Sequence, residues 1–325
     1  MNIKRPVTLA LASFCLLGFL IGPAKAVTIG PDFIANYTAT DLGSVANLPA
    51  SYGGIAFKSG DPNTVLIGGA ANTANGVYYE APVFRDGLNN ITGFGAIAPF
   101  GTVGEYNDGG IAYGPGGVLF TSQWNQNKLG QTKPLSADED KVIDLAALGL
   151  TTNTSISGLN FVPAGFSGAG KFKVVDWPGG NWYDVVLTPD GGGTFDIFSF
   201  TLEAVLGGEP EGFVFIDATG NPGFSVDSLL ISEFTAGKIA AYDLDANGDP
   251  IVATRRDFIT DLTGAEGAVI DPLTGDFLFS TSGGGDRIIR VDGFVPPPAV
   301  PEPTTALLLA LGLAGLQLSR RKPSH

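Results

Sequence analysis

Cysteine, histidine and methionine are almost absent from this sequence. In 325 residues there is one of each, Cys15, His325 and Met1, and all three lie near the ends. The body of the chain therefore has no thiol and no imidazole. This excludes cysteine nucleophiles, Ser-His-Asp triads, zinc sites built from Cys or His, and disulfides within the body.

Positive charge is also scarce. The chain has 18 basic and 32 acidic residues, and residues 27–300 keep 12 of the basic and 31 of the acidic ones, a net charge of −19. Such a surface repels phosphate backbones, so nucleic acid is excluded as a partner, whereas cations are attracted.

Disorder is excluded by the apolar content. Hydrophobic residues make up 44% of the chain and aromatic residues 10%, with 22 Phe. Disordered segments are poor in aromatics and rich in charge. The length fits one large all-β domain or two ordinary domains.

Residues 1–26 have the pattern of a secretory signal peptide. Lys4 and Arg5 precede an apolar run, Val7–Ile21, and Ala24-Lys25-Ala26 forms a small-residue cleavage site. The sequence therefore predicts an exported protein whose mature chain begins near Val27. The alternative is a buried N-terminal helix.

The C-terminus has a second patterned segment. Residues 296–303 form a Pro-rich linker that ends in Pro301-Glu302-Pro303, and an apolar run from Ala306 to Leu316 follows. Arg320, Arg321 and Lys322 come after it. Residues 304–319 are barely long enough to cross about 30 Å of hydrocarbon. The basic cluster would stay on the cytoplasmic side, leaving the body outside.

This order of motifs resembles a PEP-CTERM sorting signal. The resemblance covers about the last 25 residues of 325 and implies processing by an exosortase-type enzyme, with residues 304–325 as a transmembrane sorting tail. It implies a transient inner-membrane intermediate, followed by a cell-surface or extracellular location, often in an exopolysaccharide or biofilm matrix. The alternative is an ordinary single-pass anchor.

The body contains a repeat of roughly 50 residues. Each unit opens with a glycine and an apolar strand, followed by a second strand, a turn and a third strand. The opening glycines, spaced by 56, 48, 54 and 55 residues, are Gly54, Gly110, Gly158, Gly212 and Gly267. A repeat of this length with about four strands is typical of a β-propeller blade.

The ends of the body complete one more repeat. Residues 267–294 and 27–54 together equal a full interval, so a strand near Asp32–Thr40 is expected to close the last blade. We therefore predict an all-β, five-bladed propeller over residues 27–295. A six-bladed propeller and a two-sheet sandwich are the alternatives. One short helix is expected at Asp138–Leu148.

The blade pattern resembles NHL and gluconolactonase-like propellers, most clearly over residues 264–276. In a propeller the loop before each innermost strand opens at the central channel. The residues before the repeated glycines are expected to converge there: Gly53, Gly109, Ser157, Glu211 and Glu266, with Asp108 beside them.

Several carboxylates at one channel mouth favour calcium, which takes six to eight oxygen ligands. The candidate ligands are Asp108, Glu211 and Glu266. In Pro210-Glu211-Gly212 and Ala265-Glu266-Gly267 the Glu-Gly pair resembles that of metal-dependent lactonase-type propellers, which implies a Ca²⁺-dependent hydrolase with Glu211 or Glu266 as its base. The alternative is a solvated acidic rim that binds no metal.

Two other features suggest binding. Asp243, Asp245 and Asn247 have the spacing of an EF-hand loop, but Thr254 stands where that loop needs its last Glu, and a plain Asn-Gly hairpin is the competing interpretation. Trp124, Trp177 and Trp182 lie in or beside hairpins, where they could stack on sugars or pack between blades.

These observations favour an exported, non-catalytic propeller that binds a partner, a surface protein or a polysaccharide. No catalytic residue is assigned, although the sequence does not exclude an enzyme. The Ca²⁺-dependent hydrolase and a structural surface protein without a discrete site are the alternatives.

Overall fold

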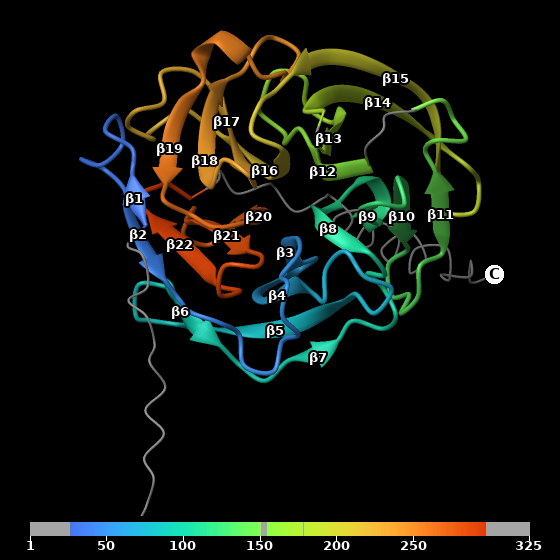
Figure 1. The fold of residues 1–325 in the computed structure, drawn as a ribbon, viewed down its shortest axis with the longest axis horizontal. Coiled ribbons are helices and arrows are strands. Elements are labelled where there is room, and N and C mark those ends of the chain that lie inside the picture. Colours follow the sequence, from blue (N-terminus) through green and yellow to red (C-terminus); the bar gives the residue numbers. More distant parts are fainter. Residues whose placement is uncertain (1–26, 151–154, 178, 297–325) are drawn as a thin grey trace, which may run out of the picture.

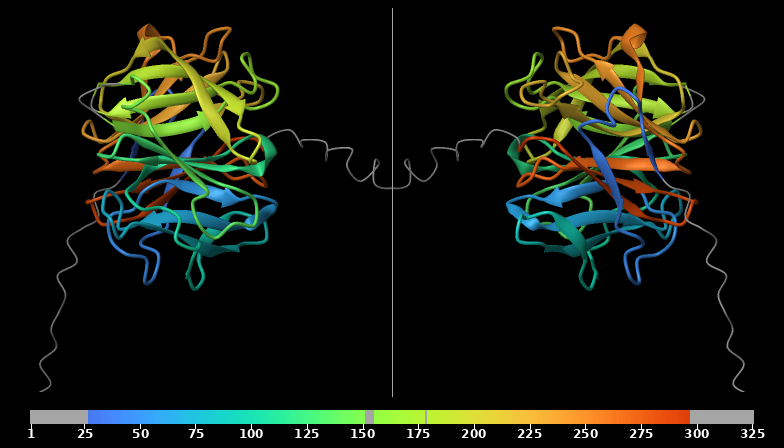
Figure 2. Two further views of the ribbon diagram at one scale, coloured as in Figure 1. Left: turned by 90° about the vertical axis from the view of Figure 1, so that its right-hand side faces the viewer. Right: turned by 90° about the vertical axis from the view of Figure 1, so that its left-hand side faces the viewer.

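A computed structural model describes residues 27–150, 155–177 and 179–296. They form five antiparallel sheets around a common axis (Figure 1), which confirms the predicted five-bladed propeller. Figure 2 shows the ring from the side, with the inner strands running between its two faces.

Each blade holds at least four strands. The strands of the first two blades are, for blade 1, β3 (Ile55–Lys58), β4 (Asp61–Gly69), β5 (Val77–Arg85), β6 (Ile91–Phe94) and β7 (Ala98–Pro99), and for blade 2, β8 (Asn107–Tyr113), β9 (Leu119–Gln123), β10 (Lys128–Thr132) and β11 (Lys141–Asp144).

The other three blades follow the same order from the axis outwards. Their strands are, for blade 3, β12 (Ser155–Phe161), β13 (Phe172–Trp177), β14 (Asn181–Pro189) and β15 (Phe195–Val205), for blade 4, β16 (Pro210–Ile216), β17 (Ser228–Glu233), β18 (Lys238–Asp243), β19 (Arg256–Thr260) and β1 (Thr28–Ile29), and for blade 5, β20 (Ala265–Ile270), β21 (Phe277–Thr281), β22 (Ile288–Asp292) and β2 (Thr38–Asp41).

Helical structure among the described residues is limited to two 3₁₀ turns, η1 (Pro115–Gly117) and η2 (Val252–Thr254). The helix predicted at Asp138–Leu148 is wrong, because its middle is β11, the outer strand of blade 2. Val142 is exposed and Ile143 buried, which is the alternation of a strand edge and not of a helix.

The N-terminal segment closes the ring, as predicted, but with shifted bounds. The closing strand is β2, which pairs with β22, whereas the residues before it form turns and β1 pairs with β19 of blade 4. Tyr37 lies 4.6 Å from Phe294, centroid to centroid, within an aromatic cluster. Both ends of the domain are thus packed into the same part of the core.

A glycine collar, formed by the five repeated glycines, narrows the axis. A Cβ on Gly158 would lie 2.0 Å from the Glu211 carbonyl oxygen, and one on Gly267 would lie 2.6 Å from the Cα of Gly54. Side chains cannot fit between backbones this close. The collar therefore explains why each repeat opens with glycine, and it places five strand starts around one point.

Candidate metal centre and binding face

The inner strands share a break in pairing near their starts. In blades 2 to 5 the register shifts between Asn107 and Ile111, Ile156 and Gly158, Pro210 and Phe213, and Ala265 and Ala268. Such bulges are common next to functional sites because they redirect a side chain. Here the bulges hold Asp108, Ser157, Glu211 and Glu266.

The backbone before three of these bulges has one conformation. Tyr106, Glu209 and Gly264 each lie two residues before an acid and have φ values of 54°, 57° and 61°. A left-handed conformation is unfavourable for Tyr and Glu. Each carbonyl accepts an amide hydrogen from the turn after the second strand, namely from Trp124, Phe234 or Ser282. The same turn thus directs all three acids.

Asp108, Glu211 and Glu266 form an acidic triad on the axis. Carboxylate oxygens of the three side chains lie within 4.8 Å of one another, although the residues come from blades 2, 4 and 5. The side chains are buried, with at most 3% of any residue exposed. The alternative of a solvated acidic rim is therefore wrong for these three residues.

Most oxygens of the triad have no partner. Asp108 Oδ2, Glu211 Oε2 and both oxygens of Glu266 are buried without a hydrogen bond among the described residues. Asn72, with its amide nitrogen assigned to face the triad, donates to Asp108 Oδ1 at 3.0 Å. Buried carboxylates without donors are costly unless a proton or a cation neutralises them.

The two other places of the ring carry no charge. Blade 1 places Gly53 there, and blade 3 places Ser157, whose hydroxyl donates to the Pro210 carbonyl at 2.6 Å. In blade 2 the place belongs to Asp108 and not to Gly109, because that bulge has one residue more. The rule of counting back from the glycine is therefore wrong by one residue in blade 2.

Burial dominates the electrostatics of the triad. It raises the pKa of Asp108 to about 7 and the pKa values of Glu211 and Glu266 well above their ordinary range. Repulsion from Asp108 raises the last two further. Near neutral pH the cluster therefore holds protons unless a cation replaces them.

The donor set fits a hard cation. It consists of carboxylate oxygens alone, with neither nitrogen nor sulfur, which suits Ca²⁺ or Mg²⁺ better than zinc or copper. Three carboxylates supply at most six oxygens, the lower limit for Ca²⁺. The triad residues could therefore hold such an ion.

The EF-hand-like segment is a hairpin. Asp245 Oδ1 accepts the amide hydrogens of Asn247 and Asp249 at 2.7 and 3.0 Å, and Leu244 bridges to Pro250. Asp249 turns inward, where Lys173 forms an ion pair with it. These contacts match the hairpin interpretation.

The three tryptophans separate into two groups. Trp182 is fully buried, packs against Phe213 at 4.6 Å and donates to Asp249 Oδ1 at 2.8 Å. Trp124 and Trp177, from blades 2 and 3, meet edge to face with ring centroids 5.3 Å apart. Both are partly exposed.

The Trp124–Trp177 pair lies at the same end of the ring as the acidic triad. Trp124 directly follows β9, whose last residue pairs with Asn107 at the start of β8, and Trp177 pairs with Ser155 at the start of β12. This end of the ring is hereafter the tryptophan face.

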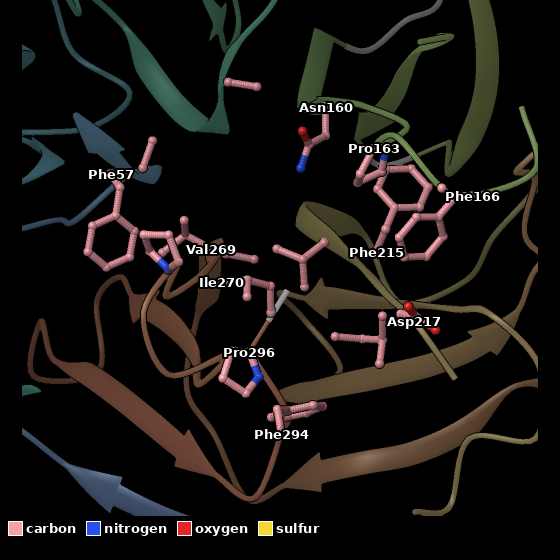
Figure 3. A pocket seen from close by; sticks show the side chains of 18 of the residues that line it. Phe57, Asn160, Pro163, Phe166, Phe215, Asp217, Val269, Ile270, Phe294 and Pro296 are labelled. Atoms are coloured by element: carbon pink, nitrogen blue, oxygen red, sulfur yellow. The ribbon is translucent and has the colours of Figure 1, made fainter. Parts of the chain in front are cut away.

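An apolar pocket of about 410 Å³ opens at the other end of the inner strands. Figure 3 shows Phe57 on one side and Phe166 and Phe215 on the other, with Ile270 between them. None of the triad residues lines it. The sequence analysis missed this pocket, since its lining residues follow the ordinary alternation of strands.

The described chain ends at this pocket. Phe294, Val295 and Pro296 line it, so the C-terminal segment leaves the propeller at the end opposite the tryptophan face. Within the described ranges no helix is long and apolar enough to cross a membrane. The predicted segments 1–26 and 304–325 lie outside those ranges.

The C-terminal motif is confirmed by comparison with protein families. Residues 299–322 match the model of the PEP-CTERM protein-sorting motif, which includes Pro301, Glu302 and Pro303 and the three basic residues. The motif implies an exported protein processed by an exosortase. No curated protein matches the chain in sequence.

Among solved structures, the body resembles propellers of several kinds. One is an auxiliary nutrient binding protein from Bacteroides ovatus, 9% identical, with 79% of this chain and 76% of that chain covered and a TM-score of 0.42. Another is a putative gluconolactonase, 13% identical, with 83% and 99% covered and a TM-score of 0.45. A third is a calcium structure of Trichoderma reesei Carbohydrate-Active Enzymes Family AA12, 11% identical, with 82% and 98% covered and a TM-score of 0.42. Likenesses this distant transfer no activity or ligand to this chain.

Proposed function

We propose that this chain is a non-catalytic surface propeller that binds a polysaccharide or a surface partner at its tryptophan face. The observation that carries the proposal is the placement of the two ends of the ring. The sorting motif follows the pocket end, and the partly exposed Trp124–Trp177 pair lies at the opposite end. While the tail is in the inner membrane, the tryptophan face is the one directed away from it.

The chemistry of that face supports carbohydrate as the partner. The indole rings offer apolar surface for the faces of sugar rings. Asn125 beside them is exposed and Asn181 follows on the next hairpin, so amide groups are at hand for hydroxyls. The absence of His and Cys from the body supports a binding role over catalysis.

Binding to defined polysaccharides tests this function. Electrophoresis of the full-length protein in gels that contain dextran, alginate or soluble cellulose should show retardation by at least one of them. Trp124→Ala and Trp177→Ala should each weaken the binding by at least about fivefold, because a central aromatic contact is worth more than about 1 kcal/mol.

Phe198→Ala is the matched control, since Phe198 is an aromatic residue of blade 3 that is 76% exposed on the outer strand β15. It should bind like the wild type. Unchanged binding by both Trp variants, or no retardation by any of the three polymers, would refute carbohydrate binding at this face.

The acidic triad supports a second candidate, a Ca²⁺-dependent hydrolase. A bound cation would polarise a substrate carbonyl, and a carboxylate would have to serve as the base. The main pocket, however, is lined by none of the triad residues. Hydrolysis of gluconolactone by the protein in Ca²⁺, lost in Glu211→Gln, would favour this candidate over the first.

A further inference from the structure

We propose that the pocket at the membrane-side end of the propeller is a docking site for the chain's own Pro-rich linker, residues 297–301. Docking would hold the Pro301-Glu302-Pro303 sorting motif against the propeller. The proposal concerns the face opposite the tryptophans and does not depend on carbohydrate binding.

The first argument is the shape and chemistry of the pocket. Its walls come from the ends of the inner strands and carry aromatic rings on opposite sides, including Phe57, Tyr113 and Phe215 (Figure 3). Phe215 is buried, whereas Phe57 and Tyr113 are partly exposed and so present ring faces to the cavity. Grooves lined by aromatic rings are what Pro-rich segments bind in other proteins.

The second argument is where the described chain ends. Phe294 is buried, and the Val295 amide donates to Asn221 Oδ1 at 2.9 Å. A Cβ on Gly275 would lie 2.2 Å from the Val295 carbonyl oxygen, so the backbone is tightly packed there. Pro296 then borders the cavity itself. The next residue must start at the mouth of the pocket.

The third argument is the sequence that follows. Residues 297–301 read Pro-Pro-Ala-Val-Pro, with no charge and three prolines. Such a segment favours the polyproline II conformation and loses little entropy on docking. Because it is tethered at the mouth, its effective concentration at the pocket is on the order of millimolar.

Thiol labelling can test the docking in the full-length protein. The only cysteine, Cys15, lies in the predicted signal peptide, so Ala299→Cys gives the mature chain a single thiol. The protein would be made in a host without the sorting enzyme, to keep the tail, and labelled with a maleimide. Ile270→Asp would place a charge in the pocket wall, and Leu273→Asp is the control, since Leu273 is 41% exposed in the same blade and does not line the pocket.

We expect the Ala299→Cys thiol to react about tenfold more slowly in the wild-type background than with Ile270→Asp, which corresponds to about 1.4 kcal/mol. Leu273→Asp should react as slowly as the wild type. Thermal melting checks that the variants fold, and Ala164→Arg, on an exposed loop that lines the pocket, decides the result if Ile270→Asp does not fold.

Equal labelling rates in the wild-type and pocket-variant backgrounds would overturn the docking. Equal rates together with binding of a fluorescent fatty acid that Ile270→Asp abolishes would assign the pocket to a lipid instead.

Discussion

The hydroxyl of Ser280 in blade 5 donates to the Gly53 carbonyl in blade 1 at 2.6 Å, and it accepts the amide hydrogen of Gly267 at 2.8 Å. Ser280 therefore joins the last blade to the first beside the axis. In blade 2 the hydroxyl of Ser122 makes the corresponding bond to the Ser157 carbonyl of blade 3 at 2.8 Å. The ring is held by hydrogen bonds between blades as well as by apolar packing.

Removal of this serine should destabilise the ring closure. Ser280→Ala leaves a buried amide and a buried carbonyl without a side-chain partner, and we expect the free energy of unfolding to fall by about 1–3 kcal/mol. Denaturant unfolding measures the change. Ser59→Ala, at an exposed position, should alter stability by less than about 0.5 kcal/mol. Equal stability of the two variants would show that Ser280 does not hold the blades together.

The glycine collar makes a second prediction. A Cβ on Gly267 would lie 2.6 Å from both the Cα of Gly54 and the amide nitrogen of Ile55, so blades 5 and 1 would have to separate. We expect Gly267→Ala to lower the free energy of unfolding by about 1–3 kcal/mol, as overpacked cores do.

Gly87→Ala is the control for the collar, since Gly87 has no atom within 4 Å of an added Cβ. It should change stability by less than about 0.5 kcal/mol. If Gly267→Ala were no more harmful than Gly87→Ala, close approach would not be the reason for the repeated glycines.

The sequence predicted the ring because the collar requires glycine at a fixed interval. It also predicted the acids, since Glu211 and Glu266 directly precede collar residues. It missed by one residue in blade 2, where the length of a bulge is decided by pairing with β9 and leaves no mark in the sequence. The helix predicted at Asp138–Leu148 failed because pairing of β11 with β10 outweighs local helical preference.

Without metal, the stability should fall as the pH rises. The raised pKa values of the triad mean that its protonated form stabilises the native state fully at acid pH, and that this stability is lost as the pH passes the native value, about 7 for Asp108. In EDTA, the melting temperature should therefore decrease between pH 5.5 and 8.

Glu266→Gln should make that decrease shallower, because one buried group no longer ionises. Glu105→Gln, which removes an exposed carboxylate, should leave the slope as in the wild type. A wild-type melting temperature that is flat over this range would contradict the electrostatic description of the triad.

Calcium should reverse this dependence if the triad binds it. A cation replaces the protons, so it binds more tightly at pH 8 than at pH 5.5, where protons compete. At 100 times the dissociation constant the native state would gain about 2.7 kcal/mol. Melting of the wild type in EDTA and in roughly millimolar Ca²⁺, the range typical of extracellular sites, measures the gain.

The choice of variants locates the calcium site. Glu211→Gln and Glu266→Gln should each reduce the Ca²⁺-dependent shift, because each removes one of the three carboxylates that meet within 4.8 Å. Asp245→Asn, in the hairpin that resembles an EF-hand, should keep the full shift. An equal shift in all of these proteins would place the ion elsewhere. No shift in the wild type would mean that protons alone neutralise the triad, and the Ca²⁺-dependent hydrolase would lose its only structural support.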